Sequence, residues 1–148
     1  MEKVILIFAL IISFMAKAQI LNPVKWKTAV TKISDSEYEL VATATIESGW
    51  HLYSQNVPEN GPIPTSFTFE GNPKYLKKGN TAEEKGNTVY DPIFEMQITY
   101  FANKADFKQR IKLKGKKPFQ VKSIVEFMVC DDSKCLPPSE VDLVFSIN

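Results

Sequence analysis

The two cysteines of this 148-residue chain lie close together near its C-terminus. Cys130 and Cys135 are separated by four residues, within the stretch VEFMVCDDSKCLPP at residues 125–138. Two thiols at this spacing can close a disulfide, exchange one with another protein, or bind a metal. Zinc sites usually need four Cys or His ligands, and only His51 could join the cysteines, so we expect no metal and no other cofactor.

The N-terminus indicates that the protein is exported. Residues 1–18 have the pattern of a secretory signal peptide, with basic Lys3, an apolar stretch from Val4 to Met15, and an Ala-Lys-Ala cleavage site. The apolar stretch is too short to span a bilayer, so we expect no stable membrane insertion after cleavage. Disulfides persist outside the cytosol, and an even cysteine count makes a Cys130–Cys135 bond the default expectation.

Residues 19–148 have a length that suits a single domain. This part of the chain carries equal numbers of basic and acidic side chains. Because no basic face dominates, we expect no nucleic-acid partner.

Two-residue alternation of apolar and polar side chains recurs along the chain and predicts short strands. Residues 71–89 are rich in Gly, Asn, Lys and Glu and are expected to be mostly irregular, with a helical turn possible at Ala82–Lys85. Many short strands without a convincing helix favour an all-β fold, an immunoglobulin-like antiparallel β-sandwich. The expected strands are Val24–Val30, Glu37–Glu47, Trp50–Gln55, Thr65–Glu70, Ile93–Ala102, Ala105–Lys114, Phe119–Val129 and Glu140–Ile147.

The position of Cys130 within its strand predicts how exposed it is. Apolar side chains from Phe119 to Val129 share one face, and Cys130 falls on the other face with Lys122 and Glu126. We therefore expect Cys130 near the surface unless a bulge intervenes. A six-residue disulfide ring would also stabilise the fold by only about 2 kcal/mol, which makes it a weak structural link.

These observations leave two functions open. Position and ring size favour a disulfide that exchanges with partners, whereas most disulfides of secreted proteins are structural. The alternative is therefore a non-enzymatic β-sandwich binding module with a structural Cys130–Cys135 bond. Asp131 and Asp132 disfavour a thiolate while Lys134 favours one, so an exchanging pair would react poorly with small thiols and need a docked partner.

The segment VEFMVCDDSKCLPPSEVDLVFSI resembles the closing part of the N-terminal domain of the thiol:disulfide interchange protein DsbD. That family shows a strand, a cysteine, a short acidic loop, a second cysteine, Pro-Pro and a final strand. Gly49–Tyr53 resembles a further strand of the family, and Tyr90–Phe94 falls where its cap loop leads into a strand. The resemblance implies an immunoglobulin-like fold in the periplasm. It also implies electron transfer from a separate membrane-embedded thiol reductase to periplasmic thioredoxin-fold or disulfide-containing proteins.

The resemblance also implies a role for individual residues. Cys135 would attack the disulfide of the acceptor, and Cys130 would resolve the mixed disulfide. His51 and Tyr53 would flank the cysteines, and a cap loop would fall within about Glu83 to Tyr90. That segment has no phenylalanine, so Val89 or Tyr90 would shield the sulfurs. The better-known members have five residues between their cysteines, whereas this chain has four.

Overall fold

The computed structural model describes residues 21–148, and every regular element among them is a β-strand. No helix in this range is long and apolar enough to cross a membrane. The proposed signal peptide lies outside the described residues. The strands are β1 (Val24–Lys32), β2 (Glu37–Ile46), β3 (His51–Tyr53), β4 (Ser66–Phe69), β5 (Tyr75–Glu83), β6 (Asn87–Asp91), β7 (Met96–Phe101), β8 (Lys104–Leu113), β9 (Phe119–Phe127), β10 (Val129–Cys130) and β11 (Ser139–Ile147).

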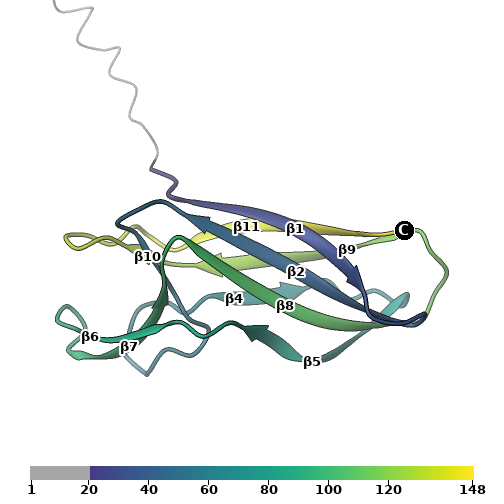
Figure 1. Cartoon of the computed structure of the whole chain (residues 1–148), viewed down its shortest axis with the longest axis horizontal. Coiled ribbons are helices and arrows are strands. Elements are labelled where there is room, and N and C mark those ends of the chain that lie inside the picture. Colours follow the sequence, from purple (N-terminus) through teal and green to yellow (C-terminus); the bar gives the residue numbers. More distant parts are fainter. Residues whose placement is uncertain (1–20) are drawn as a thin grey trace, which may run out of the picture.

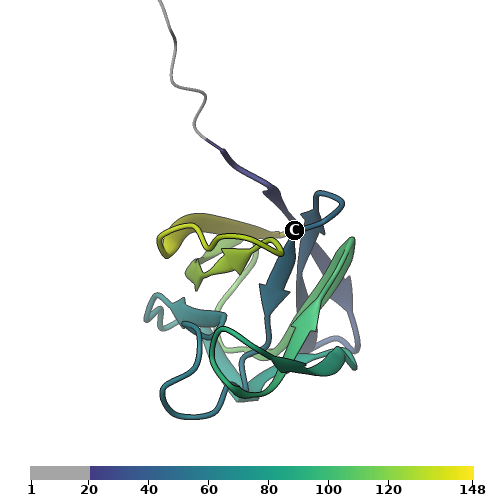
Figure 2. The same cartoon turned by 90° about the vertical axis from the view of Figure 1, so that its left-hand side faces the viewer.

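The strands form two antiparallel layers, as Figures 1 and 2 show. One layer has the strand order β1-β2-β8-β5, and the facing layer has the order β11-β9-β4. Their edges meet where the Thr28 hydroxyl on β1 donates a 2.8 Å hydrogen bond to the Val144 carbonyl on β11. The predicted all-β antiparallel sandwich is therefore confirmed.

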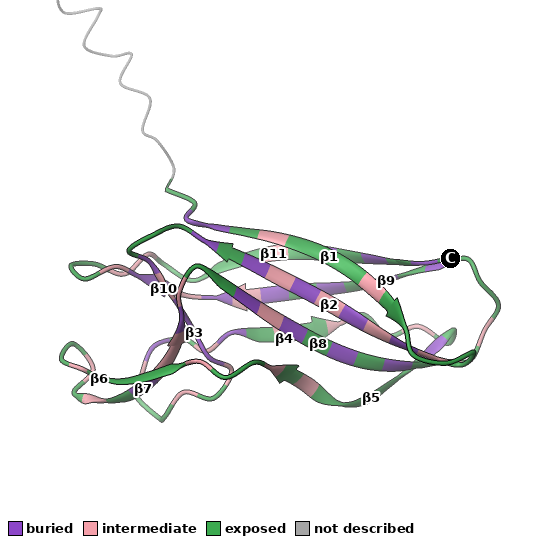
Figure 3. Cartoon of the chain, in the orientation of Figure 1, coloured by how far each residue is buried: buried purple, intermediate pink, exposed green. Residues whose placement is uncertain are grey.

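The main core lies between these two layers. Side chains alternate between buried and outward-facing positions along β2, β8 and β9, as the colouring of Figure 3 shows. The partly buried Trp26 ring packs against the rings of Phe67, Phe107 and Phe127, with centroid separations of 5.5–6.0 Å. Edge-on and tilted aromatic packing of this kind adds to the stabilisation that apolar burial provides.

A third sheet, with the order β10-β3-β7-β6, lies at the end of the sandwich away from the C-terminus (Figure 1). The chain enters it from β9, because the ladder stops at Phe127 and resumes on β3 after Met128. Val129 then pairs with Leu52, and Cys130 pairs with His51. The crossing from one sheet to another therefore places the first cysteine.

The expectation that residues 71–89 are irregular is wrong, and so is the possible helical turn at Ala82–Lys85. These residues contain β5 and β6, each at the edge of a sheet. Both strands are mostly exposed, so their side chains show no apolar alternation. Backbone pairing with β8 and β7 holds them in place, and backbone pairing leaves no pattern in the sequence.

Two other expected strands are shorter in the structure. The strand at Trp50–Gln55 is limited to β3, His51–Tyr53. The strand at Ile93–Ala102 begins only at Met96, because the Asp91 carboxylate accepts hydrogen bonds from the backbone N–H groups of Ile93 (2.8 Å) and Phe94 (3.2 Å). These bonds hold residues 92–95 in the turn between β6 and β7.

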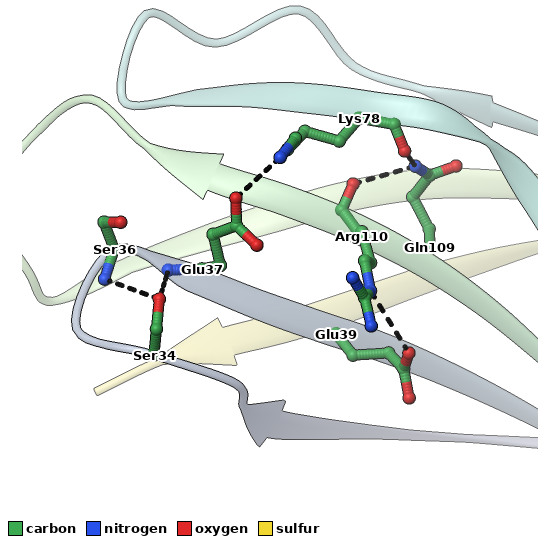
Figure 4. Close-up of polar contacts among 7 residues, drawn as sticks. All are labelled: Ser34, Ser36, Glu37, Glu39, Lys78, Gln109 and Arg110. Carbon is green, nitrogen blue, oxygen red and sulfur yellow. Dashed lines mark hydrogen bonds and ion pairs between the residues drawn. The ribbon is translucent and has the colours of Figure 1, made fainter.

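A bulge in β5 is held by a buried amide on β8. The pairing register between β5 and β8 shifts between Lys78 and Ala82. The carboxamide nitrogen of Gln109 donates to the carbonyl oxygens of Lys78 (3.1 Å) and Arg110 (2.8 Å), as Figure 4 shows. Its oxygen accepts a 2.9 Å hydrogen bond from Thr81 Oγ1. Buried polar groups need such partners, so Gln109 fixes the bulge and the direction in which β5 continues.

Candidate functional site

The two cysteines face each other across a tight turn at the end of the sandwich. They form an isolated antiparallel bridge, and their sulfurs are joined in a disulfide with a Cα–Cα distance of 4.0 Å. Backbone hydrogen bonds from Asp131 N to Lys134 O and from Leu136 N to Val129 O, each 2.9 Å, close the turn on both sides of the pair. The backbone therefore keeps the two sulfurs adjacent.

The Asp131 side chain organises the four residues between the cysteines. One carboxylate oxygen accepts hydrogen bonds from the backbone N–H groups of Ser133 and Lys134, both at 2.8 Å, and from the Ser133 hydroxyl at 2.9 Å. The Ser133 backbone N–H makes the largest contribution to lowering the pKa of Asp131 below its ordinary value. The carboxylate form is therefore the one that holds the turn.

Cys130 is buried, with an exposed fraction of only 2%. The expectation that it lies near the surface is wrong, although the predicted alternation is right. Val129 packs into the main core, and Cys130 points the opposite way into a second hydrophobic cluster with Tyr53 and Ile98. The face opposite the main core is covered here by side chains from β3, β7 and the β6–β7 turn, and strand parity along β9 and β10 cannot reveal these contacts.

The two cysteines differ in burial. Cys135 is half-buried and packs at the margin of the second cluster, whereas Cys130 lies inside it. Among residues 21–148 no cluster of His, Cys, Asp and Glu side chains could hold a metal ion.

His51 and Tyr53, the residues expected to flank the cysteines, lie on β3 beside them. His51 pairs with Cys130 in the strand register, and its ring stacks on Tyr100 with a centroid separation of 4.1 Å. Tyr53 is buried in the same cluster as Cys130. Burial, followed by the nearby charge of Asp91, raises the pKa of Tyr53 to about 12, so its phenol stays neutral at physiological pH.

Val89 and Tyr90, the expected shield, lie on β6 and are exposed at 41% and 59%. Both line an open pocket of about 270 Å³ that also reaches Cys130. Residues of the β6–β7 hairpin and of the cysteine turn both line it, and these two segments lie at the left-hand end of the molecule in Figure 1. The pocket is lined by His51, Tyr53, Val89, Tyr90, Asp91, Pro92, Ile93, Tyr100, Cys130, Asp131 and Asp132.

Phe94 is a site residue that sequence reasoning did not single out. It lies in the turn between β6 and β7, and its ring meets the Tyr53 ring edge-on with a centroid separation of 6.4 Å. It packs on the second cluster, as do Met96, Tyr100, Met128 and Cys135. The alternation of Phe94, Met96, Ile98 and Tyr100 could have identified it, since these side chains line the cluster of the cysteines rather than the main core.

Glu83 joins the end of β5 to the residues that follow β3. Its carboxylate accepts hydrogen bonds from the Ser54 hydroxyl (2.5 Å), the Gln55 backbone N–H (2.8 Å) and the Asn56 side-chain amide (3.2 Å). Ser54 directly follows Tyr53, and Glu83 stands four residues before β6 begins at Asn87. This carboxylate thus ties the strand of the flanking aromatics to the base of the β6–β7 hairpin.

Comparisons with known proteins agree with this arrangement. A family model described as thiol:disulfide interchange protein DsbD, N-terminal, matches residues 17–145. The reduced N-terminal domain of DsbD from Neisseria meningitidis is similar in structure, with a TM-score of 0.58, 16% identity, and coverage of 87% of this chain and 91% of that chain. No curated protein sequence matches the chain.

A second similar structure is the N-terminal periplasmic domain of ScsB from Proteus mirabilis. Its TM-score is 0.62 at 9% identity, and the match covers 84% of this chain but 46% of that chain, so this chain spans about half of it. At such identities the likeness concerns the fold, and the predicted immunoglobulin-like fold is confirmed. Because the family model covers nearly all of the described strands, the chain belongs to the family of DsbD N-terminal domains.

Proposed function

We propose that this chain carries out thiol–disulfide exchange through Cys130 and Cys135. The observation that supports this best is the unequal burial of the two cysteines. Cys135 is half-buried at the margin of a cluster, whereas Cys130 is 2% exposed beside it. Exchange by a cysteine pair needs one sulfur that a partner can reach and a second that is held close but protected. Membership of the DsbD N-terminal family supports the same role.

The exchange proceeds in two displacement steps. In the reduced protein the Cys135 thiolate attacks a sulfur of the acceptor's disulfide, forming a mixed disulfide and releasing the first acceptor thiolate. The Cys130 thiolate then attacks the Cys135 sulfur, which releases the second acceptor thiolate. The acceptor gains two electrons and two thiols after protonation, and this chain regains the Cys130–Cys135 disulfide.

The reverse sequence regenerates the dithiol. A thiolate of the donor attacks the Cys135 sulfur and releases the Cys130 thiolate, and the donor's second thiol then displaces Cys135. The proposed donor is a membrane-embedded thiol reductase, and the proposed acceptors are periplasmic thioredoxin-fold or disulfide-containing proteins. The proposed compartment is the periplasm, reached through the signal peptide proposed for residues 1–18.

The surroundings of the pair support selective rather than general reactivity. The β6–β7 hairpin, with Val89 and Tyr90 on β6 and Phe94 in its turn, is proposed as the shield of the sulfurs. His51 and Tyr53 are proposed as the flanking residues that support the pair from β3. The carboxylates of Asp131 and Asp132 next to Cys130 disfavour a thiolate until a partner docks.

A non-enzymatic binding module with a structural disulfide is the second candidate. The burial of Cys130 favours it, since structural disulfides are commonly buried. The small ring argues against it, because closing six residues stabilises the fold by only about 2 kcal/mol.

Trapping of a mixed disulfide tests the proposed function. We expect Cys130→Ser to accumulate a mixed disulfide with an oxidised periplasmic thioredoxin-fold protein, because the resolving thiol is absent. Cys135→Ser is the matched control, and its buried remaining thiol should trap little. Both variants should lose electron transfer to the disulfide protein. Unchanged electron transfer in the two variants would contradict the proposal and favour the structural disulfide.

A further inference from the structure

The pocket beside the cysteines has an exposed apolar ledge. Val89, Tyr90 and Ile93 are exposed at 41%, 59% and 57%, and all three line the same pocket. They come from one short stretch of the β6–β7 hairpin, whereas the other strongly exposed large apolar residues described lie elsewhere along the chain. Single exposed apolar side chains are ordinary, but a group of them beside a pocket marks an interaction surface.

The charged residues around this ledge are acidic. Asp91, Asp131 and Asp132 line the pocket, and neither a lysine nor an arginine does. Burial is the main cause of the raised pKa of Tyr53, and the charge of Asp91 adds to it. Lys134 lies exposed in the same turn but does not line the pocket.

Asp132 is available to a partner. It is exposed and makes no side-chain hydrogen bond or ion pair with any residue between 21 and 148. Asp91 and Asp131, by contrast, use one carboxylate oxygen each to hold their own turns. An anion without such a role can be replaced without disturbing the fold, and it contributes directly to the field that an approaching protein meets.

From this combination we infer that the ledge of Val89, Tyr90 and Ile93 is the docking surface for a protein whose disulfide lies in an apolar patch bordered by lysine or arginine side chains. This inference rests on the proposed exchange function and adds the chemistry by which a partner is chosen. Apolar contact with the ledge would bring the partner's disulfide to the cysteine pair, of which Cys130 lines the pocket and Cys135 is bonded to it. The three carboxylates would attract the lysine or arginine side chains around the partner's apolar patch. No positive charge lines the pocket to repel them.

The chemical step of the docked complex is the one described above. The Cys135 thiolate bonds to one sulfur of the partner, whose disulfide breaks, and the Cys130 thiolate then completes the reduction of the partner. Two electrons pass to the partner, and no further oxidant or reductant is needed. Docking of basic groups also offsets the negative charge of the aspartates near the thiols, which favours the thiolate that attacks. A partner with basic groups around its disulfide should therefore exchange fastest.

Two synthetic peptides test this inference. Both have one disulfide within the same apolar sequence, and one is flanked by lysines while the other is flanked by glutamates. The second-order rate constant for oxidation of the reduced protein is measured with each peptide. This rate constant is then divided by the rate constant for the reaction of the same peptide with 2-mercaptoethanol. This division removes the effect of the flanking charges on the disulfide itself.

We expect the normalised rate constant to be about tenfold higher for the lysine peptide at low ionic strength, and the ratio to shrink as salt is added. Asp132→Lys should lower the ratio severalfold. Asp142→Lys is the matched control, because it makes the same charge change on the outer face of β11. Equal normalised rates for the two peptides, or equal effects of the two variants, would overturn the inference.

The apolar part of the surface is tested in the same assay. Replacing Val89, Tyr90 and Ile93 by serine should slow exchange with both peptides relative to exchange with oxidised 2-mercaptoethanol, a comparison that removes the effect of uncovering the sulfurs. The control replaces Ile124 and Val144, which are exposed at 41% and 40% on the outer face of β9 and β11, by serine. It should leave both rates unchanged. Equal slowing in the two sets would contradict a specific ledge. If neither peptide oxidised the protein at all, the proposed function itself would fall, and this inference with it.

Discussion

Asp131 links the cysteine turn to pH. Its pKa is lowered by hydrogen bonds from Ser133 and Lys134, the backbone N–H of Ser133 contributing most. For a carboxyl whose pKa is lower in the folded state, the stabilisation is complete above the unfolded pKa and is lost as pH falls through the folded pKa. The turn should therefore keep its structure through the ordinary range of carboxyl titration and loosen only in stronger acid.

Amide hydrogen exchange at Ser133 and Lys134 checks this. In the unmodified protein their protection should fall only at a pH below the ordinary carboxyl pKa. Asp131→Asn keeps an oxygen acceptor, so its protection should persist without that pH dependence, whereas Asp131→Ala should lose protection at every pH. Protection that is equal in the alanine and unmodified proteins would show that the backbone alone holds the turn.

The environment of single residues was only partly predictable from the sequence. Alternation along β9 and β10 gave the direction of Cys130 correctly, because side-chain direction follows strand parity. Its burial could not be predicted, since that depends on β3 and β7, which come from distant parts of the chain. Phe94 was missed for a similar reason, because the apolar alternation that contains it serves a second cluster.

At the scale of elements, Glu83 is the connection that joins β5, β3 and the β6–β7 hairpin. The bulge held by Gln109 precedes Glu83 in β5. The register of β5 after the bulge therefore sets the position of the Glu83 carboxylate. Three donors from residues 54–56 converge on it. Since the Ser54 side chain is fully buried, its hydroxyl needs this acceptor.

Glu83→Ala should lower the free energy of unfolding by about 1–3 kcal/mol, because it leaves the buried Ser54 hydroxyl without its acceptor. Urea unfolding measures this loss, and faster amide exchange at Gln55 would locate it. Glu84→Ala is the matched control, because Glu84 is exposed and accepts only the Asp106 N–H at 2.9 Å. A loss no larger than that of the control would show that Glu83 does not anchor the hairpin.

The sequence predicted well those strands in which every second side chain is buried in the core. The expected strand Glu37–Glu47 corresponds to β2, Glu37–Ile46, because its alternating burial reflects a two-layer sandwich. By contrast, β5 and β6 are edge strands with exposed side chains on both faces, so no alternation indicated them. The hairpin that carries the proposed shield was therefore the least predictable part of the site.

At the scale of the whole molecule, the disulfide lies outside the main core of the sandwich. The main core is formed mostly by strands of the two large layers, with Leu52, Phe101 and Val129 added from the third sheet, whereas Cys130 belongs to a separate cluster at one end. A protein that cycles between disulfide and dithiol must stay folded in both forms. The separation of the two clusters allows this.

Reducing the disulfide should therefore lower the free energy of unfolding by only about 2 kcal/mol, the value for a small ring. Urea unfolding of the oxidised and reduced proteins checks this, with the Cys130→Ser, Cys135→Ser double variant as a control for the dithiol form. A reduced protein that is unfolded without denaturant would mean that the disulfide is structural.

The reduction potential of the Cys130–Cys135 pair tests the central claim most directly. Equilibration with dithiothreitol buffers, followed by alkylation of free thiols, gives the potential of the folded protein. An exchanging pair should have a potential clearly above about −300 mV, in the range of proteins that pass electrons to one another. A potential well below that value would identify a structural disulfide and contradict the proposed function.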